Sequence, residues 1–186
     1  MWCLFCFLLS IIATQAQVHL KKQSFIEFGV GGYDKVYPNI HHISTFIAVG
    51  KYDKKINAHT VGVGFQQKEA ALFDSKNVVK LSNTVPVKQF FLYYKTDFKL
   101  YSNVMNNFII KGTGRVNFGY ESLNNQSDYS AEYQLKSKSD FLLGLGAGLE
   151  VEYSPIIIGV QQNINILSDY QKFSTVPYLG FRFHLH

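Results

Sequence analysis

The chain has 186 residues, of which 16% are aromatic, 17% are charged and 14 are glycine. This length predicts one domain, and no internal apolar run approaches the 18 or more residues that a membrane-spanning helix requires. The net charge is +5, but the lysines are scattered over predicted turns and loops and only two arginines are present. The charge therefore favours a solvated surface, and we expect no direct binding of nucleic acid.

Residues 1–16 are predicted to be a signal peptide that is cleaved after Ala16. An apolar run over residues 2–13 is followed by Thr14-Gln15-Ala16, which places small residues at the two positions that a signal peptidase reads. An uncleaved anchor is the alternative, but the run is too short to span a bilayer comfortably. Both cysteines, Cys3 and Cys6, lie in this segment, so the mature domain (residues 17–186) is expected to lack thiol chemistry.

The first half of the mature chain predicts four strands, at about residues 25–33, 43–52, 60–66 and 85–98. In the first of these, Ile26 and Phe28 alternate with Glu27 and glycine, as in a strand whose two faces meet different surroundings. The fourth strand is apolar on both faces, so its pattern does not indicate which side chains point inward. A long polar loop is expected over residues 68–84.

The fifth predicted strand, residues 108–121, shows the alternation most clearly. Apolar residues or glycine occupy every second position from Phe108 to Tyr120, and polar residues, including Lys111 and Arg115, occupy most of the positions between them. Ten steps of about 3.3 Å along a strand tilted near 40° give roughly 25 Å, the height of the apolar band of an outer-membrane barrel. The apolar face is therefore predicted to contact lipid, and the charged face to point into a lumen.

Three further strands are predicted at residues 141–153, 156–166 and about 178–185, after a second long polar loop over residues 122–138. The total of eight, with short connections after the second and sixth strands and long ones after the third and fifth, is typical of outer-membrane barrels. The predicted fold is an all-β, eight-stranded antiparallel up-and-down transmembrane barrel of the outer-membrane type. Its predicted location is the outer membrane, with its outer face against lipid.

The lumen of an eight-stranded barrel is just wide enough for its own side chains, so buried charges must be paired there. We expect a structural charge network made of Glu27, Lys111, Arg115, Glu121, Glu150, Glu152 and Arg182. Counting back from the loop that follows the fifth strand places Lys111 near Gly148 and Arg115 near Gly144. The glycines of the sixth strand would then leave room for long basic side chains.

Catalytic and ligand-binding patterns are weak in this sequence. Glu150 and Glu152 share a strand face and could form an acid–base pair, but ion pairing in the lumen explains them better. His41, His42 and His59 lack acidic neighbours at metal-ligand spacing. The glycines at 144, 146 and 148 lack the spacing of a dinucleotide loop. We therefore expect no enzymatic activity, no metal and no cofactor.

Three segments of the second half combine glycine, aromatic and acidic residues. They are Gly119-Tyr120-Glu121-Ser-Leu-Asn124, Ser139-Asp140-Phe141 through Gly148-Leu-Glu150-Val-Glu152-Tyr153, and Gly180-Phe181-Arg182-Phe183. The chain resembles, through them, the TraO family of conjugative-transposon proteins. The resemblance implies an outer-membrane component of the mating apparatus in conjugative DNA transfer, and it supplies no catalytic residues.

The leading functional hypothesis is a structural barrel of the conjugation system that contacts other transfer proteins through loops 68–84 and 122–138. A generic small barrel for adhesion or membrane integrity is the second. An outer-membrane enzyme acting on lipid or peptide is less favoured, because no nucleophile and base are evident. A soluble lipocalin-like carrier would require an apolar interior and a polar exterior, the reverse of the predicted arrangement.

Overall fold

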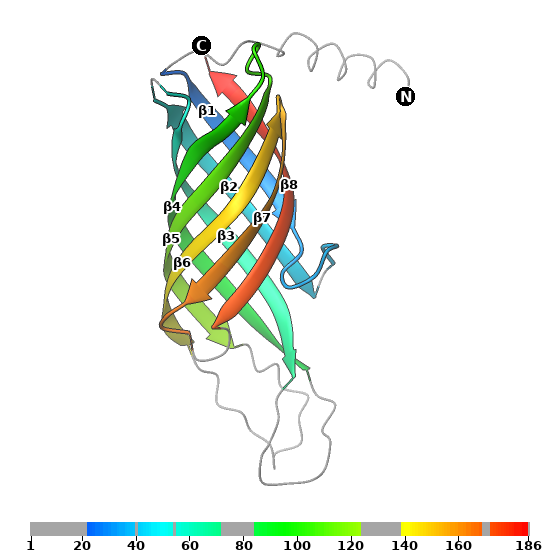
Figure 1. The fold of residues 1–186 in the computed structure, drawn as a ribbon. Coiled ribbons are helices and arrows are strands. Elements are labelled where there is room, and N and C mark those ends of the chain that lie inside the picture. Colours follow the sequence, from blue (N-terminus) through cyan, green and yellow to red (C-terminus); the bar gives the residue numbers. More distant parts are fainter. Residues whose placement is uncertain are drawn as a thin grey trace, which may run out of the picture.

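The computed structural model describes residues 22–39, 41–53, 55–71, 84–123, 139–168 and 172–185. In these residues eight strands form one closed barrel, in which each strand pairs with its neighbours in the chain and β8 pairs with β1 (Figure 1). The strands are β1 (Ser24–Gly31), β2 (His42–Tyr52), β3 (Ala58–Ala71), β4 (Thr84–Ser102), β5 (Phe108–Leu123), β6 (Ser139–Tyr153), β7 (Ile156–Asn165) and β8 (Phe173–Leu185). No helix of the described residues is long and apolar enough to cross a membrane.

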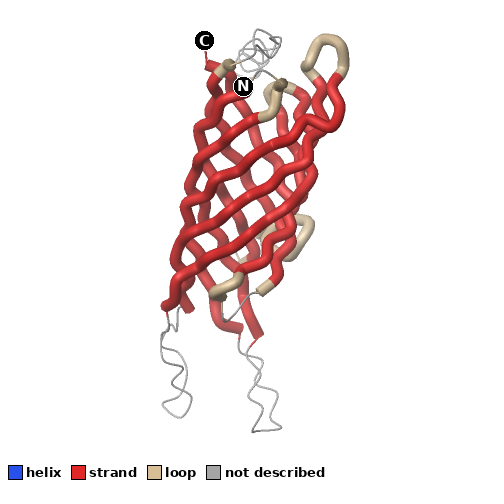
Figure 2. Tube along the Cα trace, turned by 60° about the vertical axis from the view of Figure 1, so that its left-hand side comes forward, coloured by secondary structure: helices blue, strands red, loops and turns tan. Residues whose placement is uncertain are grey.

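All eight pairings are antiparallel, so the connections alternate between the two ends of the barrel. One end, here called the turn end, holds the short connections at residues 53–57, 103–107 and 154–155, together with the start of β1 and the end of β8. The opposite loop end holds the connections after β1, β3, β5 and β7. Figure 2 shows the strands running obliquely between these two ends.

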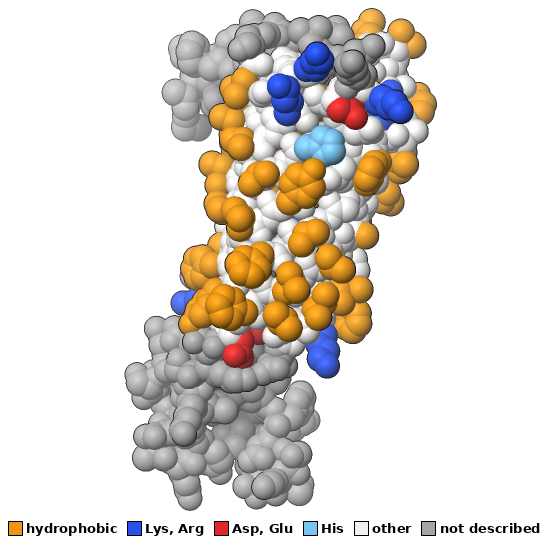
Figure 3. Space-filling model, turned by 90° about the vertical axis from the view of Figure 1, so that its left-hand side faces the viewer, with side chains coloured by type: hydrophobic (Ala, Val, Ile, Leu, Met, Phe, Trp, Pro, Cys, Tyr) orange, Lys and Arg blue, Asp and Glu red, His pale blue; other side chains and the backbone are white. Residues whose placement is uncertain are grey.

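Apolar side chains cover the outside of the barrel. On β7, for example, Ile158 and Val160 are exposed, whereas Gln161 and Asn163 are buried. Figure 3 shows apolar side chains over the middle of the wall, with charged side chains gathered towards its ends. A closed sheet leaves no unpaired strand edge, and this distribution of side chains is that of a membrane-spanning barrel with a polar lumen. The predicted outer-membrane type of fold is confirmed.

Several strands extend further than the sequence pattern predicts. β3 runs on to Ala71 and β5 to Leu123, so both expected loops begin with residues that belong to strands. β4 runs to Ser102 and contains an irregularity between Lys99 and Tyr101. The reason is that ladder pairing continues into polar residues beyond the apolar band, where hydropathy no longer marks the strand. Residues 72–83 and 124–138, and the predicted signal peptide, lie outside the described residues.

The inward face of β4 carries two aromatic rings, those of Phe91 and Tyr93. They fit because β3 has glycine on its lumen face. A Cβ atom added to Gly64 would lie 2.4 Å from the Phe91 ring, and one added to Gly62 would lie 2.7 Å from Cζ of Tyr93. The apolar pattern of β4 left open which of its side chains point inward. The space beside the glycines of β3 determines this.

We expect a charge on the outer wall to destabilise the barrel in a membrane. Leu149 is 56% exposed on β6, and Leu149→Arg should cost about 2–4 kcal/mol of folding free energy in lipid vesicles. Val104, in the β4–β5 turn, is 100% exposed, and Val104→Arg is the matched control with little expected effect. Denaturant titration of the vesicle-inserted proteins measures both costs, and equal values would contradict a lipid-facing wall.

Candidate functional site: the lumen charge network

Seven Asp, Glu, Lys and Arg side chains converge in the lumen towards the turn end, and no more than 5% of any of these side chains is exposed. They come from five strands: Glu27 of β1, Lys95 and Asp97 of β4, Lys111 of β5, Glu150 and Glu152 of β6, and Arg182 of β8. Their inward direction follows from the two-residue period of each strand. We refer to this group as the lumen charge network.

Arg182 connects the acidic side chains. Its Nε donates a hydrogen bond to Oε2 of Glu27 at 2.9 Å, and its Nη1 lies 2.6 Å from Oε2 of Glu152. Its Nη2 also contacts Glu27 and lies 3.0 Å from Oε1 of Glu150. The planar guanidinium presents five donors in a fixed arrangement, which suits it to several carboxylates at once.

The two lysines complete the pairing. Lys95 Nζ lies 3.0 Å from Oε1 of Glu27 and 3.0 Å from Oε2 of Glu150. Lys111 Nζ contacts Glu152 and lies 3.8 Å from Oε1 of Glu150. Each carboxylate of the network therefore has at least one cationic neighbour, which is the condition for burying charge without prohibitive cost.

Tyrosine hydroxyls and an apolar layer border the network. Tyr52 donates to Glu152 at 2.9 Å, and Tyr178 donates to Glu150 at 2.8 Å. Towards the turn end the lumen is filled by a buried apolar cluster. Its members are Phe25, Tyr52, Ile56, Ala58 and Ile109. This layer separates the ion pairs from the solvent at the turn end.

Two of the predicted residues lie apart from the network. Arg115 stacks its guanidinium over the Tyr93 ring at 4.0 Å and the Phe91 ring at 4.8 Å, and its Nε donates to Asn117. Glu121, nearer the loop end, accepts hydrogen bonds from Gln89 and Ser168. Neither side chain forms an ion pair with a described residue, so the expected pairing of Arg115 with the carboxylates is not what the structure shows.

The expected neighbours of the basic side chains are displaced by two residues. Lys111 pairs with Glu150, and Arg115 pairs with Gly146. The count from the loop is wrong because β5 and β6 continue to pair as far as Ser122 and Ser139. The glycines of β6 make room for amide and hydroxyl groups: a Cβ at Gly144 would lie 2.6 Å from Asn165 Oδ1, and one at Gly148 would lie 2.9 Å from Thr113 Oγ1.

Sequence reasoning missed four members of this site: Lys95, Asp97, Tyr52 and Tyr178. Lys95 and Asp97 were not predicted to lie in the lumen, because β4 is apolar on both faces. Both residues lie on the same face of the strand as Tyr93. A signal was available, since the four predicted lumen carboxylates outnumber the three predicted cations, Lys111, Arg115 and Arg182. Tyr52 is the last residue of β2, where aromatic residues also line the membrane interface. Tyr178 lies in the middle of β8, although the sequence pattern predicts that this strand begins there.

The arrangement is poorly suited to acid–base or metal chemistry. Glu150 and Glu152 are fully buried, and their carboxylates are held by cations and tyrosines. Among the described residues, no group of three His, Cys, Asp or Glu side chains could hold a metal ion. His41 contacts Glu69, and His59 Nδ1 lies 2.8 Å from the Tyr94 hydroxyl, so each of these histidines has an ordinary protein partner.

Removal of Arg182 should destabilise the barrel more than removal of Arg115. Arg182→Met leaves the carboxylates of Glu27 and Glu152 short of a cation, which costs about 3–5 kcal/mol. Arg115→Met removes stacking on two rings, worth about 2 kcal/mol when desolvated. The measurement is the temperature at which each variant changes from the gel mobility of the folded barrel to that of the unfolded chain. We expect this temperature to fall more for Arg182→Met, and a larger fall for Arg115→Met would contradict the network described above.

The barrel shares its fold with solved outer-membrane proteins. A major outer membrane protein from Thermus thermophilus matches with a TM-score of 0.64 and 12% identity, covering 89% of this chain and 100% of that one. Neisserial surface protein A matches with a TM-score of 0.53 and 10% identity, covering 87% of this chain and 97% of that one. The N-terminal β-barrel domain of Pseudomonas aeruginosa OprF matches with a TM-score of 0.51 and 11% identity, covering 88% of this chain and 100% of that one. At these identities the likeness establishes the fold alone.

No curated protein matches the chain. A family model does: the one described as "Conjugative transposon protein TraO" matches residues 21–185, which include every strand of the barrel. The resemblance found in the glycine, aromatic and acidic segments is thereby confirmed and extended to nearly the whole chain. The chain belongs to the TraO family of conjugative transposon proteins.

Proposed function

We propose that this protein is a non-enzymatic barrel of the outer membrane and a structural component of a conjugative DNA-transfer apparatus. The family match over residues 21–185 is the observation that carries the proposal, because its description ties the family to conjugative transposons. The apolar wall and the shared fold support the membrane location. The mating role extends the family description to this chain.

The turn end faces the periplasm in this proposal. Bacterial outer-membrane barrels keep short turns on the periplasmic side and longer loops outside, and the connections of 5 residues or fewer in this barrel share one end. The loop end then faces the cell exterior. Segments 68–84 and 122–138 are our proposed contact surfaces for other transfer proteins. Residues 68–71 and 122–123 of these segments are strand residues at this end.

The packed lumen favours a structural role over a conduit for DNA. Arg182 of β8 reaches Asp97 of β4 on the opposite side of the barrel, and Lys95 of β4 reaches Glu27 of β1 across the lumen. The apolar cluster around Phe25 and Ile109 fills the turn end. Eight strands leave a lumen only wide enough for side chains, so DNA would pass beside this subunit rather than through it.

One feature favours the second candidate, a barrel that mediates adhesion. The β1–β2 connection exposes Val36 (73%) and Tyr37 (81%). It is anchored at Asp34, which lies 2.9 Å from Lys68 Nζ and accepts a hydrogen bond from the backbone N–H of Thr175 at 2.8 Å. Apolar side chains on an anchored loop are suited to contact with another surface.

Deletion of the gene in a donor strain separates the two candidates. We expect the frequency of transfer to fall to background and to return when the wild-type chain is supplied in trans. The double variant Val36→Ser/Tyr37→Ser should restore transfer as well as the wild type does, because the mating role does not depend on that loop. Unchanged transfer after deletion, with loss of cell attachment or of detergent resistance instead, would reject the proposal in favour of the alternative.

A further inference from the structure

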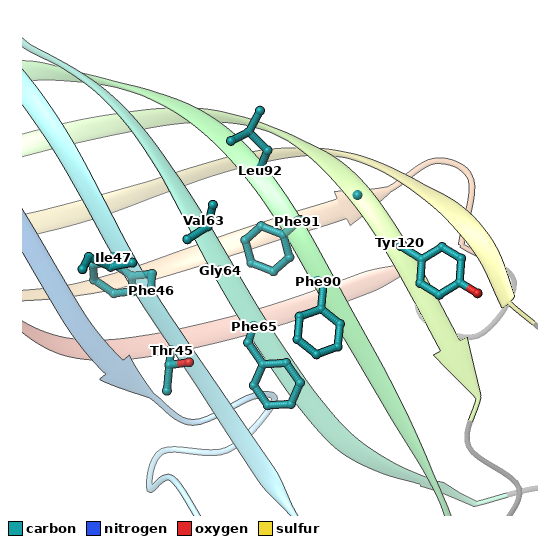
Figure 4. Close-up of a pocket in the computed structure, with 11 residues that line it drawn as sticks. Thr45, Phe46, Ile47, Val63, Gly64, Phe65, Phe90, Phe91, Leu92 and Tyr120 are labelled. Carbon is teal, nitrogen blue, oxygen red and sulfur yellow. The ribbon is translucent and has the colours of Figure 1, made fainter.

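A groove of about 620 Å³ lies on the outer wall of the barrel, over β2 to β5 and near the loop end (Figure 4). Its lining is almost entirely apolar. Phe65, Phe90 and Tyr120 lie along one side, and Ile47, Val63 and Leu92 lie along the other. A groove of this size and lining on a lipid-facing wall is suited to a hydrocarbon chain.

Two glycines, Gly64 and Gly119, lie in the lining between the larger side chains. Both are at lumen-facing positions: a Cβ on Gly64 would lie 2.4 Å from the inward Phe91 ring, and one on Gly119 would lie 2.0 Å from the carbonyl oxygen of Phe90. On the outer side these two positions therefore contribute only backbone to the floor of the groove. Its walls are outward-facing side chains of β3, β4 and β5, such as Val63, Leu92 and Tyr120.

The rows of side chains beside the groove indicate its depth in a membrane. Phe65, Phe90 and Tyr120 are paired in register across three strands, and the centroids of the two phenylalanine rings are 4.8 Å apart. Such an aromatic row marks the boundary of the apolar band. The next outward-facing residues towards the loop end are Gln67, Lys88 and Ser122, a polar row about 7 Å further along the strands.

Lys88 is the cation of this polar row, and it forms no ion pair with a described residue. Glu69, which lies beyond Gln67 on β3, contacts His41 instead. A lysine at the headgroup level with no carboxylate partner attracts an anionic headgroup. The groove and Lys88 together therefore match a lipid that carries both an acyl chain and a phosphate.

We propose that this groove binds one lipopolysaccharide molecule, with an acyl chain along Phe65, Phe90 and Leu92 and a lipid A phosphate on Lys88. Lipopolysaccharide is the anionic lipid of the outer leaflet, and the loop end faces that leaflet in the orientation proposed above. The inference rests on that orientation and not on the mating role. It assigns the mature protein a specific lipid as its partner in the outer leaflet.

The test measures binding of fluorescent lipopolysaccharide to the full mature protein in detergent micelles. Lys88→Gln should weaken binding about tenfold, the usual effect of losing one charge-assisted contact. Lys51→Gln is the matched control, because Lys51 is an exposed lysine on the outer face of β2 at the turn end. Equal affinities of the two variants would overturn the proposal.

A second pair of variants tests the groove itself. Val63→Trp fills it from the outer face, whereas Val160→Trp places the same ring on β7, on a different part of the wall. We expect only Val63→Trp to weaken binding, with both variants retaining wild-type heat-modifiable migration. The proposal would be rejected if phosphatidylglycerol competed for binding as strongly as lipopolysaccharide. It would also be rejected if sedimentation showed a dimer that Val63→Trp abolishes, because the occupant of the groove would then be a second copy of the chain.

Discussion

The pairing of β1 with β8 is the interaction on which this structure depends, because it turns an open sheet into a barrel with no free edge. Glu27 lies directly opposite Arg182 across this seam, and the two side chains are joined by hydrogen bonds inside the lumen. A seam left open in lipid would expose unpaired backbone groups, each at a cost of several kcal/mol. The ion pair therefore adds a side-chain contact to the backbone ladder at the strand pairing that closes the barrel.

The lumen is layered along its axis. An apolar cluster at the turn end is followed by the lumen charge network, and then by Arg115 on its two aromatic rings. Beyond these, buried amides dominate as far as Tyr33, whose hydroxyl donates to Gln89 at 3.0 Å. The buried amides are Gln66, Gln89, Asn117, Gln161, Asn163 and Asn165. Charge is thus concentrated in the half that the apolar cluster closes, where low polarity strengthens each ion pair.

The strands and their inward faces could be predicted from the period of two, which by itself places Lys111 and Glu150 in the lumen. The partners of these residues could not be predicted, because a shift of two residues in register preserves every face and changes every neighbour. Lys95 and Asp97 escaped prediction for a different reason. Their strand has aromatic residues on both sides, and the glycines that accommodate the inward rings, Gly62 and Gly64, belong to another strand.

Alternate residues of each strand face the membrane, and those between them face a polar lumen filled by side chains. Spin labels placed singly at residues 143–151 of β6 test this most directly, by their collision rates with oxygen, which partitions into lipid, and with a water-soluble nickel complex. We expect high oxygen accessibility at 143, 145, 147, 149 and 151, and low accessibility to both reagents at the residues between them. Strong collision with the nickel complex at the odd-numbered positions, or no alternation at all, would contradict this two-faced wall.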